Sequence, residues 1–366
     1  MLSDSTAQIA QGSSEMDIGV ITNPNSRKNL NRPNRAEVLQ SIVGQHGEVR
    51  QTHTPEEIKP ALREFLRRRA RYWVSDGGDG ALHWMLRMGL EVLQEDEFRS
   101  GGFGLPLAVP TNGGSIDFVA HNVGIRGNAE SILAALVADL KQGRRIEEVE
   151  VDSMLVRGVE IADGVERPFQ TLGFAAAAGG VGQRFFEKLE AEGAHTSWNI
   201  LSVVTRTVTG FPFASTPVGR LPGAPDRMAQ YARDMFKPTL AKVAVDGRAL
   251  PWQDYTGIHI ASMSLNLGNV FRFFGLADVP GQMHGIIGSP TPIEIIQRIP
   301  KMIAGQRLTA ARLFDGPCRE MTMEATSEEL LAPVIDGEFY QNVKSATFSL
   351  GPRLRIPKLV GRSFQN

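Results

Sequence analysis

The sequence contains a single cysteine, Cys318, among 366 residues, and its formal net charge is only −1. One cysteine cannot form an internal disulfide or a cysteine-based metal cluster. The 39 Lys and Arg residues nearly balance the 40 Asp and Glu residues, so no overall field attracts nucleic acid or anionic lipid. We therefore expect no nucleic-acid partner, and any lipid contact must be a local patch. No apolar run reaches the roughly 18 residues that suggest a membrane-spanning helix.

The composition that is present, with 42% hydrophobic and 22% charged residues, is typical of a soluble globular protein. The length suggests two domains. Residues 1–16 are polar and rich in Ser and Gln, without the basic and apolar regions of a secretory signal, so we expect a flexible N-terminal arm there. Nothing in the sequence decides between a monomer and an oligomer.

Residues 17–147 alternate between strand-like and helix-like segments. The expected strands cover 17–22, 48–52, 72–75 and 107–109, and amphipathic helices follow near 35–44, 54–66, 81–88 and 128–140. Repeated βα alternation predicts a parallel sheet with helices on its faces. Ligands bind such sheets at the carboxyl ends of the strands, where three polar, Gly-rich turns follow Thr22, Ser75 and Val109.

Residues 148–345 have a different pattern and read as mostly β. Short strands alternate with Asp-Gly pairs, which are hairpin signals, at Asp163, Asp246, Asp315 and Asp336. We expect one helical insertion near 183–192, and a surface loop or flap over the proline-rich segment 212–226. Residues 346–366 are expected to return to the first domain.

The strongest local feature is the segment Ser75-Asp-Gly-Gly-Asp-Gly80, placed between a strand and a helix. Glycines let a phosphate approach the backbone N–H groups, and the following helix adds its positive end. Asp79 could hold Mg²⁺ on the phosphates or accept a proton from an attacking hydroxyl. The alternative is a tight turn without a ligand.

Three further segments are weak when taken alone. The polar turn 23–29 suits a phosphate or is simply solvated, and Gly-Gly-Ser at 113–115 caps a helix or binds an anion. The Asp-Gly-Glu at 336–338 is a hairpin turn or a carboxylate pair. His83 is expected on a helix surface, and Trp84 in a core or groove.

Taken in order, these segments resemble the diacylglycerol kinase catalytic-domain superfamily, which includes bacterial lipid kinases and sphingosine kinases. The family's Asn-Pro-x-Ser-Gly is matched by Asn23, Pro24 and Ser26, and its Gly-Gly-Asp-Gly-Thr by Gly77, Gly78, Asp79 and Gly80. Its third motif is matched loosely by Gly114, Ser115, Asp117 and Ala120, and its late Asp-Gly-Glu by Asp336, Gly337 and Glu338. The resemblance covers roughly residues 17 to 345.

The resemblance implies a nucleotide-binding α/β domain with a parallel sheet, a C-terminal β-sandwich domain, and an active site in the cleft between them. It also implies an ATP- and Mg²⁺-dependent kinase that phosphorylates a hydroxyl of a diacylglycerol- or sphingosine-like lipid. Such an enzyme would be cytoplasmic and would contact the inner membrane face peripherally.

The resemblance also assigns roles to individual residues. The ATP-binding positions are Asn23, Ser26, Thr52, Gly77, Gly78, Asp79, Gly80, Ala81, Gly114 and Ser115. Glu338 is the implied general base and Asp79 the alternative base, while Asp79 and Asp336 are the implied metal ligands.

Two departures keep other functions open. Ala81 replaces the usual Thr, and Trp84 stands where the family commonly has Glu. One alternative is therefore a catalytically inactive lipid- or nucleotide-binding protein of the same fold. Another is a kinase for a soluble alcohol or a dinucleotide, since kinases of both kinds also use Gly-Gly-Asp-Gly loops.

Overall fold

The computed structural model describes residues 15–361, apart from 27, 115, 194 and 195. The expected N-terminal arm therefore lies almost entirely outside the described residues. At its end, Met16 is buried and its backbone N–H donates to the carbonyl of Arg68.

The first domain is built on a parallel sheet with the strand order β2-β1-β3-β4. Its strands are β1 (Ile18–Thr22), β2 (Gly47–Gln51), β3 (Tyr72–Asp76) and β4 (Leu107–Pro110). The helices are α1 (Arg35–Val43), η1 (Gly44–His46), α2 (Pro55–Arg67), α3 (Asp79–Leu93), α4 (Asp96–Ser100), α5 (Phe118–Asn122) and α6 (Ala129–Lys141). Every residue of β1, β3 and β4 is buried, as expected for parallel strands covered on both faces.

Local signals place most of these helix ends. Gly44 ends α1 with φ at 56°, and the side chain of Asn128 accepts the backbone N–H of Ser131 to cap α6. The helix α2 begins at Pro55 as predicted, although Thr54 forms no side-chain cap. Glu57 instead accepts the backbone N–H of His53 at 2.7 Å.

The second domain is a sandwich of two antiparallel sheets. One sheet has the order β10-β8-β16-β19-β5-β6, with β9 beside β8, and contains β5 (Glu148–Ala162), β6 (Val165–Gly173), β8 (Thr239–Val245), β9 (Arg248–Ala249), β10 (Asp254–Tyr255), β16 (Glu320–Ala325) and β19 (Val343–Pro357). The other has the order β15-β14-β11-β7-β17-β18 and contains β7 (Ala175–Gly180), β11 (Gly257–Ala261), β14 (Met283–Gly288), β15 (Leu313–Cys318), β17 (Val334–Ile335) and β18 (Glu338–Phe339). A separate hairpin joins β12 (Leu265–Leu267) and β13 (Phe271–Phe273).

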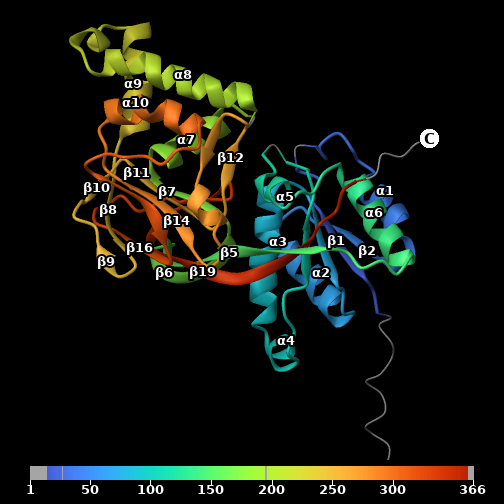
Figure 1. Cartoon of the computed structure of the whole chain (residues 1–366). Coiled ribbons are helices and arrows are strands. Elements are labelled where there is room, and N and C mark those ends of the chain that lie inside the picture. Colours follow the sequence, from blue (N-terminus) through green and yellow to red (C-terminus); the bar gives the residue numbers. More distant parts are fainter. Residues whose placement is uncertain (1–14, 27, 115, 194–195, 362–366) are drawn as a thin grey trace, which may run out of the picture.

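The inward side chains of the two sheets form the sandwich core, for example Val156 and Phe348 from one sheet and Ile258 and Ile287 from the other. The predicted fold class, a parallel α/β domain followed by a β-sandwich, is confirmed. The long strands β5 and β19, of 15 residues each, pair with one another and run from the sandwich to the parallel sheet (Figure 1). Beyond β19, Val360 forms a bridge with Arg126 of the first domain.

The second domain is more helical than the sequence suggested. The predicted insertion corresponds to α7 (Val181–Ala191), but α8 (Ser197–Ala214), η2 (Pro217–Arg220), α9 (Ala224–Phe236), η3 (Gly275–Asp278) and α10 (Pro292–Ile303) are also present. The proline-rich segment 212–226 is therefore not a loop throughout. Pro217 and Pro225 stand at the first turns of η2 and α9, where a missing N–H costs nothing. The helices α8 and α9 lie at the end of the molecule far from the parallel sheet (Figure 1).

Three of the four predicted Asp-Gly turns form. Asp163, Asp246 and Asp336 all adopt positive φ and are each followed by a positive-φ glycine. The fourth prediction was wrong, because Asp315 and Gly316 lie inside β15 and pair with Ile286 and Gly285. The Asp315 carboxylate accepts the backbone N–H of Leu308 at 2.7 Å, so its environment is set by tertiary contacts.

Candidate active site

Three loops meet at the carboxyl ends of β1, β3 and β4. A Cβ added at Gly78 would lie 2.6 Å from Cα of Gly114, and one added at Gly77 would lie 2.8 Å from Oγ of Ser26. No side chain larger than hydrogen fits at these two glycines, so the second loop contacts the backbone of the third and the Ser26 side chain of the first. Lys28 joins the first loop to the third by donating to the carbonyl of Asn112 at 2.6 Å.

These contacts bring together most of the positions predicted to bind ATP. Ser26, Gly77 and Ala81 are in contact, as are Gly78 and Gly114. Thr52 lies at the neighbouring strand end, where its N–H donates to the carbonyl of Thr22. The side chain of Asn23 accepts the N–H of Asn25 within its own turn. Ser115 lies outside the described residues.

Asp76, which the sequence did not single out, holds the base of this loop cluster. Its carboxylate is fully buried and forms two bonds with Arg35, at 2.7 and 3.0 Å. It also accepts the hydroxyl of Thr22 at 2.6 Å and the side-chain amide of Asn29 at 3.1 Å. A buried charge with this many donors is a structural anchor. Its two principal donors lie 41 and 54 residues away in the sequence, which is why no local motif revealed it.

Asp79 begins α3 and faces the first residues of α5. Its two carboxylate oxygens accept the N–H groups of Phe118 and Val119 at 3.1 and 3.3 Å. Burial, together with the nearby carboxylate of Asp117, raises the pKa of Asp79 to about 8 despite these two donors. A cation placed beside it would favour the ionised form.

The implied Mg²⁺ site fits the residues only in part. Among the described residues, no group of three or more His, Cys, Asp or Glu side chains could hold a metal ion. Mg²⁺ is usually bound by one or two carboxylates together with substrate phosphates, and Asp79 beside the glycine loop suits that arrangement. Asp336 suits it less well, because its Oδ1 accepts the backbone N–H groups of Phe174 and Ala175 at 2.9 Å each and its Oδ2 contacts the ring of His83 at 3.3 Å. Mg²⁺ at Asp79 stays a prediction.

Glu338 reaches the glycine loop from the second domain. It follows the Asp336-Gly337 turn, in which φ is 51° and 90°. Its Oε2 accepts the indole N–H of Trp84 at 2.8 Å. Its Oε1 lies so close to Gly80 that an added Cβ would collide with it. The predicted base and the predicted phosphate loop are therefore neighbours.

His83 was predicted on a helix surface, and this prediction was wrong, since the side chain is fully buried. Its ring contacts Asp336 at 3.3 Å and the hydroxyl of Tyr340 at 2.7 Å. Burial opposes the charged ring, but Tyr340 and Asp336 outweigh it and raise the pKa of His83 to about 9. The Asp336–His83 pair thus fixes the turn that carries Glu338. The partners lie more than 250 residues from His83 in the sequence, so no local pattern indicated this burial.

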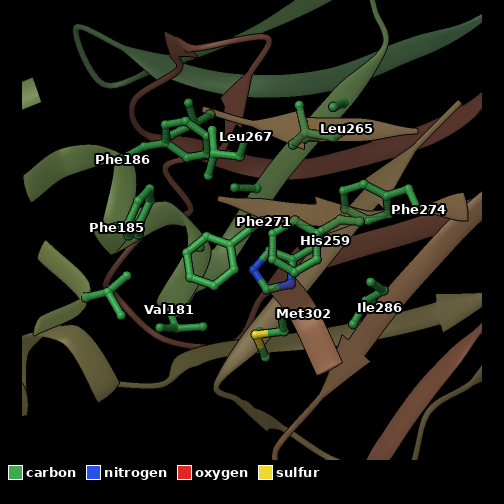
Figure 2. Close-up of a pocket in the computed structure, with 18 of the residues that line it drawn as sticks. Val181, Phe185, Phe186, His259, Leu265, Leu267, Phe271, Phe274, Ile286 and Met302 are labelled. Atoms are coloured by element: carbon green, nitrogen blue, oxygen red, sulfur yellow. The ribbon is translucent and has the colours of Figure 1, made fainter. Parts of the chain in front are cut away.

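A cavity of about 360 Å³ opens from this group of residues into the second domain. Asp79, Gly80 and Glu338 line one part of it. The remaining wall is almost entirely apolar and comes mainly from helices α7, α8, α9 and α10 and from strands β7, β11, β12, β13 and β14. Figure 2 shows Val181, Phe185, Phe186, His259, Leu265, Leu267, Phe271, Phe274, Ile286 and Met302 around it.

Comparison with known proteins gives a structural match only. No protein-family model matches the chain, and no curated protein matches it. A crystal structure of a "putative diacylglycerol kinase" from Bacillus anthracis str. Sterne aligns over 93% of this chain and 96% of its own, with a TM-score of 0.57 and 13% identity. A second structure, of a diacylglycerol kinase from the same strain, aligns over 95% and 97%, with a TM-score of 0.51 and 12% identity.

The chain has the diacylglycerol kinase fold. The structural similarity covers both domains. At 12–13% identity it establishes the fold alone. Within the part of the chain that is described, no helix is long and apolar enough to cross a membrane.

Proposed function

We propose that this protein transfers the γ-phosphoryl group of ATP to a hydroxyl of a membrane lipid. The observation that carries the proposal is the position of Glu338 and Gly80 at one end of a large apolar cavity. A soluble alcohol or a dinucleotide has no need of such a wall, whereas acyl chains fill it favourably. The fold similarity to diacylglycerol kinases agrees with this choice of substrate.

In the proposed reaction, the backbone N–H groups of Gly78–Gly80 hold the phosphates of ATP, while those of Gly77 and Gly114 stay bonded to Thr111 and Asp117. Asp79 would hold Mg²⁺, which would supply neutralisation of the phosphate charge. The lipid hydroxyl gives its proton to Glu338 while its oxygen bonds to the γ-phosphorus. The bond from that phosphorus to the bridging oxygen breaks, and ADP leaves.

Glu338 suits the role of base better than Asp79. With its pKa raised to about 8, Asp79 is largely protonated at neutral pH until a cation arrives. Glu338 has one oxygen fixed by Trp84 and the other directed at the glycine loop. An inactive, ligand-binding protein is the alternative that Ala81 and Trp84 suggested. In the structure the indole N–H of Trp84 donates to Glu338 and so helps to hold the proposed base, which favours the active enzyme.

The test is purified protein with labelled ATP, Mg²⁺ and a panel of diacylglycerol, sphingosine and phosphatidylglycerol. We expect label in the organic phase for at least one lipid, and its loss in Glu338→Gln with ATP binding retained. Label that stays in an aqueous product would instead support a soluble acceptor. Binding of nucleotide and lipid without turnover in the wild-type protein would support the inactive alternative.

We further propose that the enzyme meets the cytoplasmic face of the membrane through α8, η2 and α10. Large apolar side chains are exposed on all three. They are Trp198 and Leu201 on α8, Val218 on η2 and Leu221 just after it, and Ile293 and Ile303 on α10. Trp198 is 77% exposed. The helices α8 and α10 also line the cavity, through Val204 and Ile299 among others. A lipid leaving the bilayer along these helices would enter the cavity directly.

The basic residues near the C-terminus are a weaker candidate for membrane contact. Arg353 pairs with Asp152 at 2.9 Å, Arg355 with Glu148 at 3.3 Å and Lys358 with Glu147 at 3.4 Å. Carboxylates of the neighbouring strand thus neutralise this segment. Arg220, exposed between Val218 and Leu221 on η2, is better placed to meet anionic headgroups.

A further inference from the structure

Away from the glycine loop, the described residues contribute only four polar side chains to the cavity wall. Three of them already donate hydrogen bonds to backbone carbonyls. Thr207 donates to the carbonyl of Val203 and Thr256 to that of Pro290, each at 2.8 Å. Arg298 donates to the carbonyls of Thr309 and Glu294, each at 2.7 Å. The fourth is His259.

His259 lies on β11, facing the cavity, while its neighbours Ile258 and Ile260 point into the sandwich core. The ring sits between two glycines. A Cβ at Gly182 would collide with Nε2, and one at Gly257 would lie 2.7 Å from Cε1. Figure 2 shows the ring among Val181, Phe271, Ile286 and Met302. The fold thus keeps room for an imidazole in an apolar wall.

The imidazole is neutral in this environment. Burial lowers the pKa of His259 to about 4, against the opposing effect of the Ile286 backbone. A neutral imidazole has one N–H donor and one lone pair. The backbone of Ile286, its partner on β14, is the polar group that opposes this shift, and no side chain of the described residues forms a hydrogen bond with the ring. A ring nitrogen is therefore left for whatever fills the cavity.

The sheet gives the separation between His259 and the reacting end. The strands run in the order β18-β17-β7-β11, and Phe339, Val334, Ala177 and His259 stand in one line across them. Glu338 is next to Phe339 in β18. Three strand spacings place His259 about 14 Å from that end. The two residues between Phe339 and His259 in this row are Val334 and Ala177, and both are apolar.

We infer that His259 forms a hydrogen bond with a second polar group on the acceptor lipid, a hydroxyl or carbonyl oxygen within the hydrocarbon chain. This inference rests on the proposed function, and it excludes the ester oxygens of a plain diacylglycerol because these lie beside the phosphorylated hydroxyl. An all-hydrocarbon chain that covers the imidazole would remove its nitrogen from water without giving it a partner, and this weakens the binding of such a chain. His259 therefore selects among lipids that share one headgroup.

The test is direct binding without ATP, measured by displacement of a fluorescent fatty acid from the cavity. The ligands are diacylglycerols that are identical except for a single hydroxyl moved along one acyl chain. We expect one position to bind about five- to tenfold more tightly than the unsubstituted lipid. In His259→Leu this preference disappears and binding of the unsubstituted lipid is retained.

The matched control is Thr207→Val, which alters a cavity hydroxyl that already has a partner and leaves the preference intact. His259→Gln, which keeps a donor and an acceptor, restores part of it. A wild-type protein with no positional preference, or a preference that survives in His259→Leu, would overturn the inference. Because ATP is absent, a failure of phosphoryl transfer leaves this result untouched and counts only against the proposed function.

Discussion

Nε1 of Trp84 donates a hydrogen bond of 2.8 Å to Oε2 of Glu338, joining the first turns of α3 to a hairpin 254 residues later in the chain. The bond orients one oxygen of Glu338, so the other is directed at the glycine loop. A hydrogen bond to a charged carboxylate is worth about 1.5–3 kcal/mol. Trp84 is therefore a positioning residue for the proposed base.

Replacement of Trp84 by Phe keeps an aromatic ring and removes the donor. We expect kcat to fall about tenfold, because Glu338 is no longer held, while KM for ATP stays unchanged. In the double variant with Glu338→Gln, the Trp84 substitution has no additional effect. Equal effects of Trp84→Phe in the two backgrounds would show that the bond has no role in the reaction.

Gly80→Ala tests how closely Glu338 approaches the loop. The new methyl group collides with Oε1 of Glu338 and displaces the carboxylate. We expect kcat to fall by roughly 100-fold, the scale that follows a misplacement of about 1 Å, with the circular dichroism spectrum unchanged. The control is Gly104→Ala, since a Cβ there meets nothing within 4 Å. Full activity in Gly80→Ala would separate Glu338 from the reaction.

Asp79 gives the protein a predictable dependence of stability on pH. The folded state raises the pKa of its carboxyl from 3.8 to about 8, mainly through burial. The wild-type protein therefore loses stability as pH rises from about 4 to about 8, because folding then has to accommodate a charge. Asp79→Asn removes that loss. We expect the stability of the variant relative to wild type to rise with pH across this window, at up to about 1.4 kcal/mol per pH unit.

Thermal denaturation of the nucleotide-free protein at several pH values checks this difference. The control is Asp96→Asn, which alters a surface carboxylate with a 92% exposed side chain and follows the wild-type curve. A constant offset between Asp79→Asn and wild type at all pH values would contradict the expected cause.

The proposed membrane surface predicts the outcome of a sedimentation experiment. Replacement of Trp198 and Leu221 by Ser removes two exposed apolar side chains from α8 and the end of η2. Since burying such a side chain is worth about 1.5–3 kcal/mol, we expect binding to anionic liposomes to fall at least about tenfold. Turnover of a short-chain lipid in detergent is retained. Val165→Ser, at an exposed hairpin of the opposite sheet, leaves binding unchanged. Loss of binding in Val165→Ser as well would point to a non-specific effect.

Patterns that act over a few residues were predictable from the sequence. The order of strand, glycine loop and helix was predicted correctly, and Asp163, Asp246 and Asp336 formed turns because Asp tolerates positive φ. Patterns that depend on distant partners were not predictable. Asp315 has the same Asp-Gly signal but lies inside a strand, where tertiary pairing overrides the local preference. The roles of Asp76, His83 and His259 come from neighbours far along the chain.

The paired strands β5 and β19 also limit how this protein can move. They run through both domains without interruption except for register shifts near Ser345 and Arg353. Residues of β19 such as Leu354 and Ile356 share one core with the parallel sheet. Two long strands paired in this way form a stiff connection, so we expect little bending between the domains. In the proposed function, the lipid therefore enters past α8, α9 and α10, which pack beside the sandwich at the end far from the parallel sheet (Figure 1). Hydrogen exchange that is fast in α8, α9 and α10 and slow in β5 and β19 would indicate that the cavity opens by movement of these helices and not by bending between the domains.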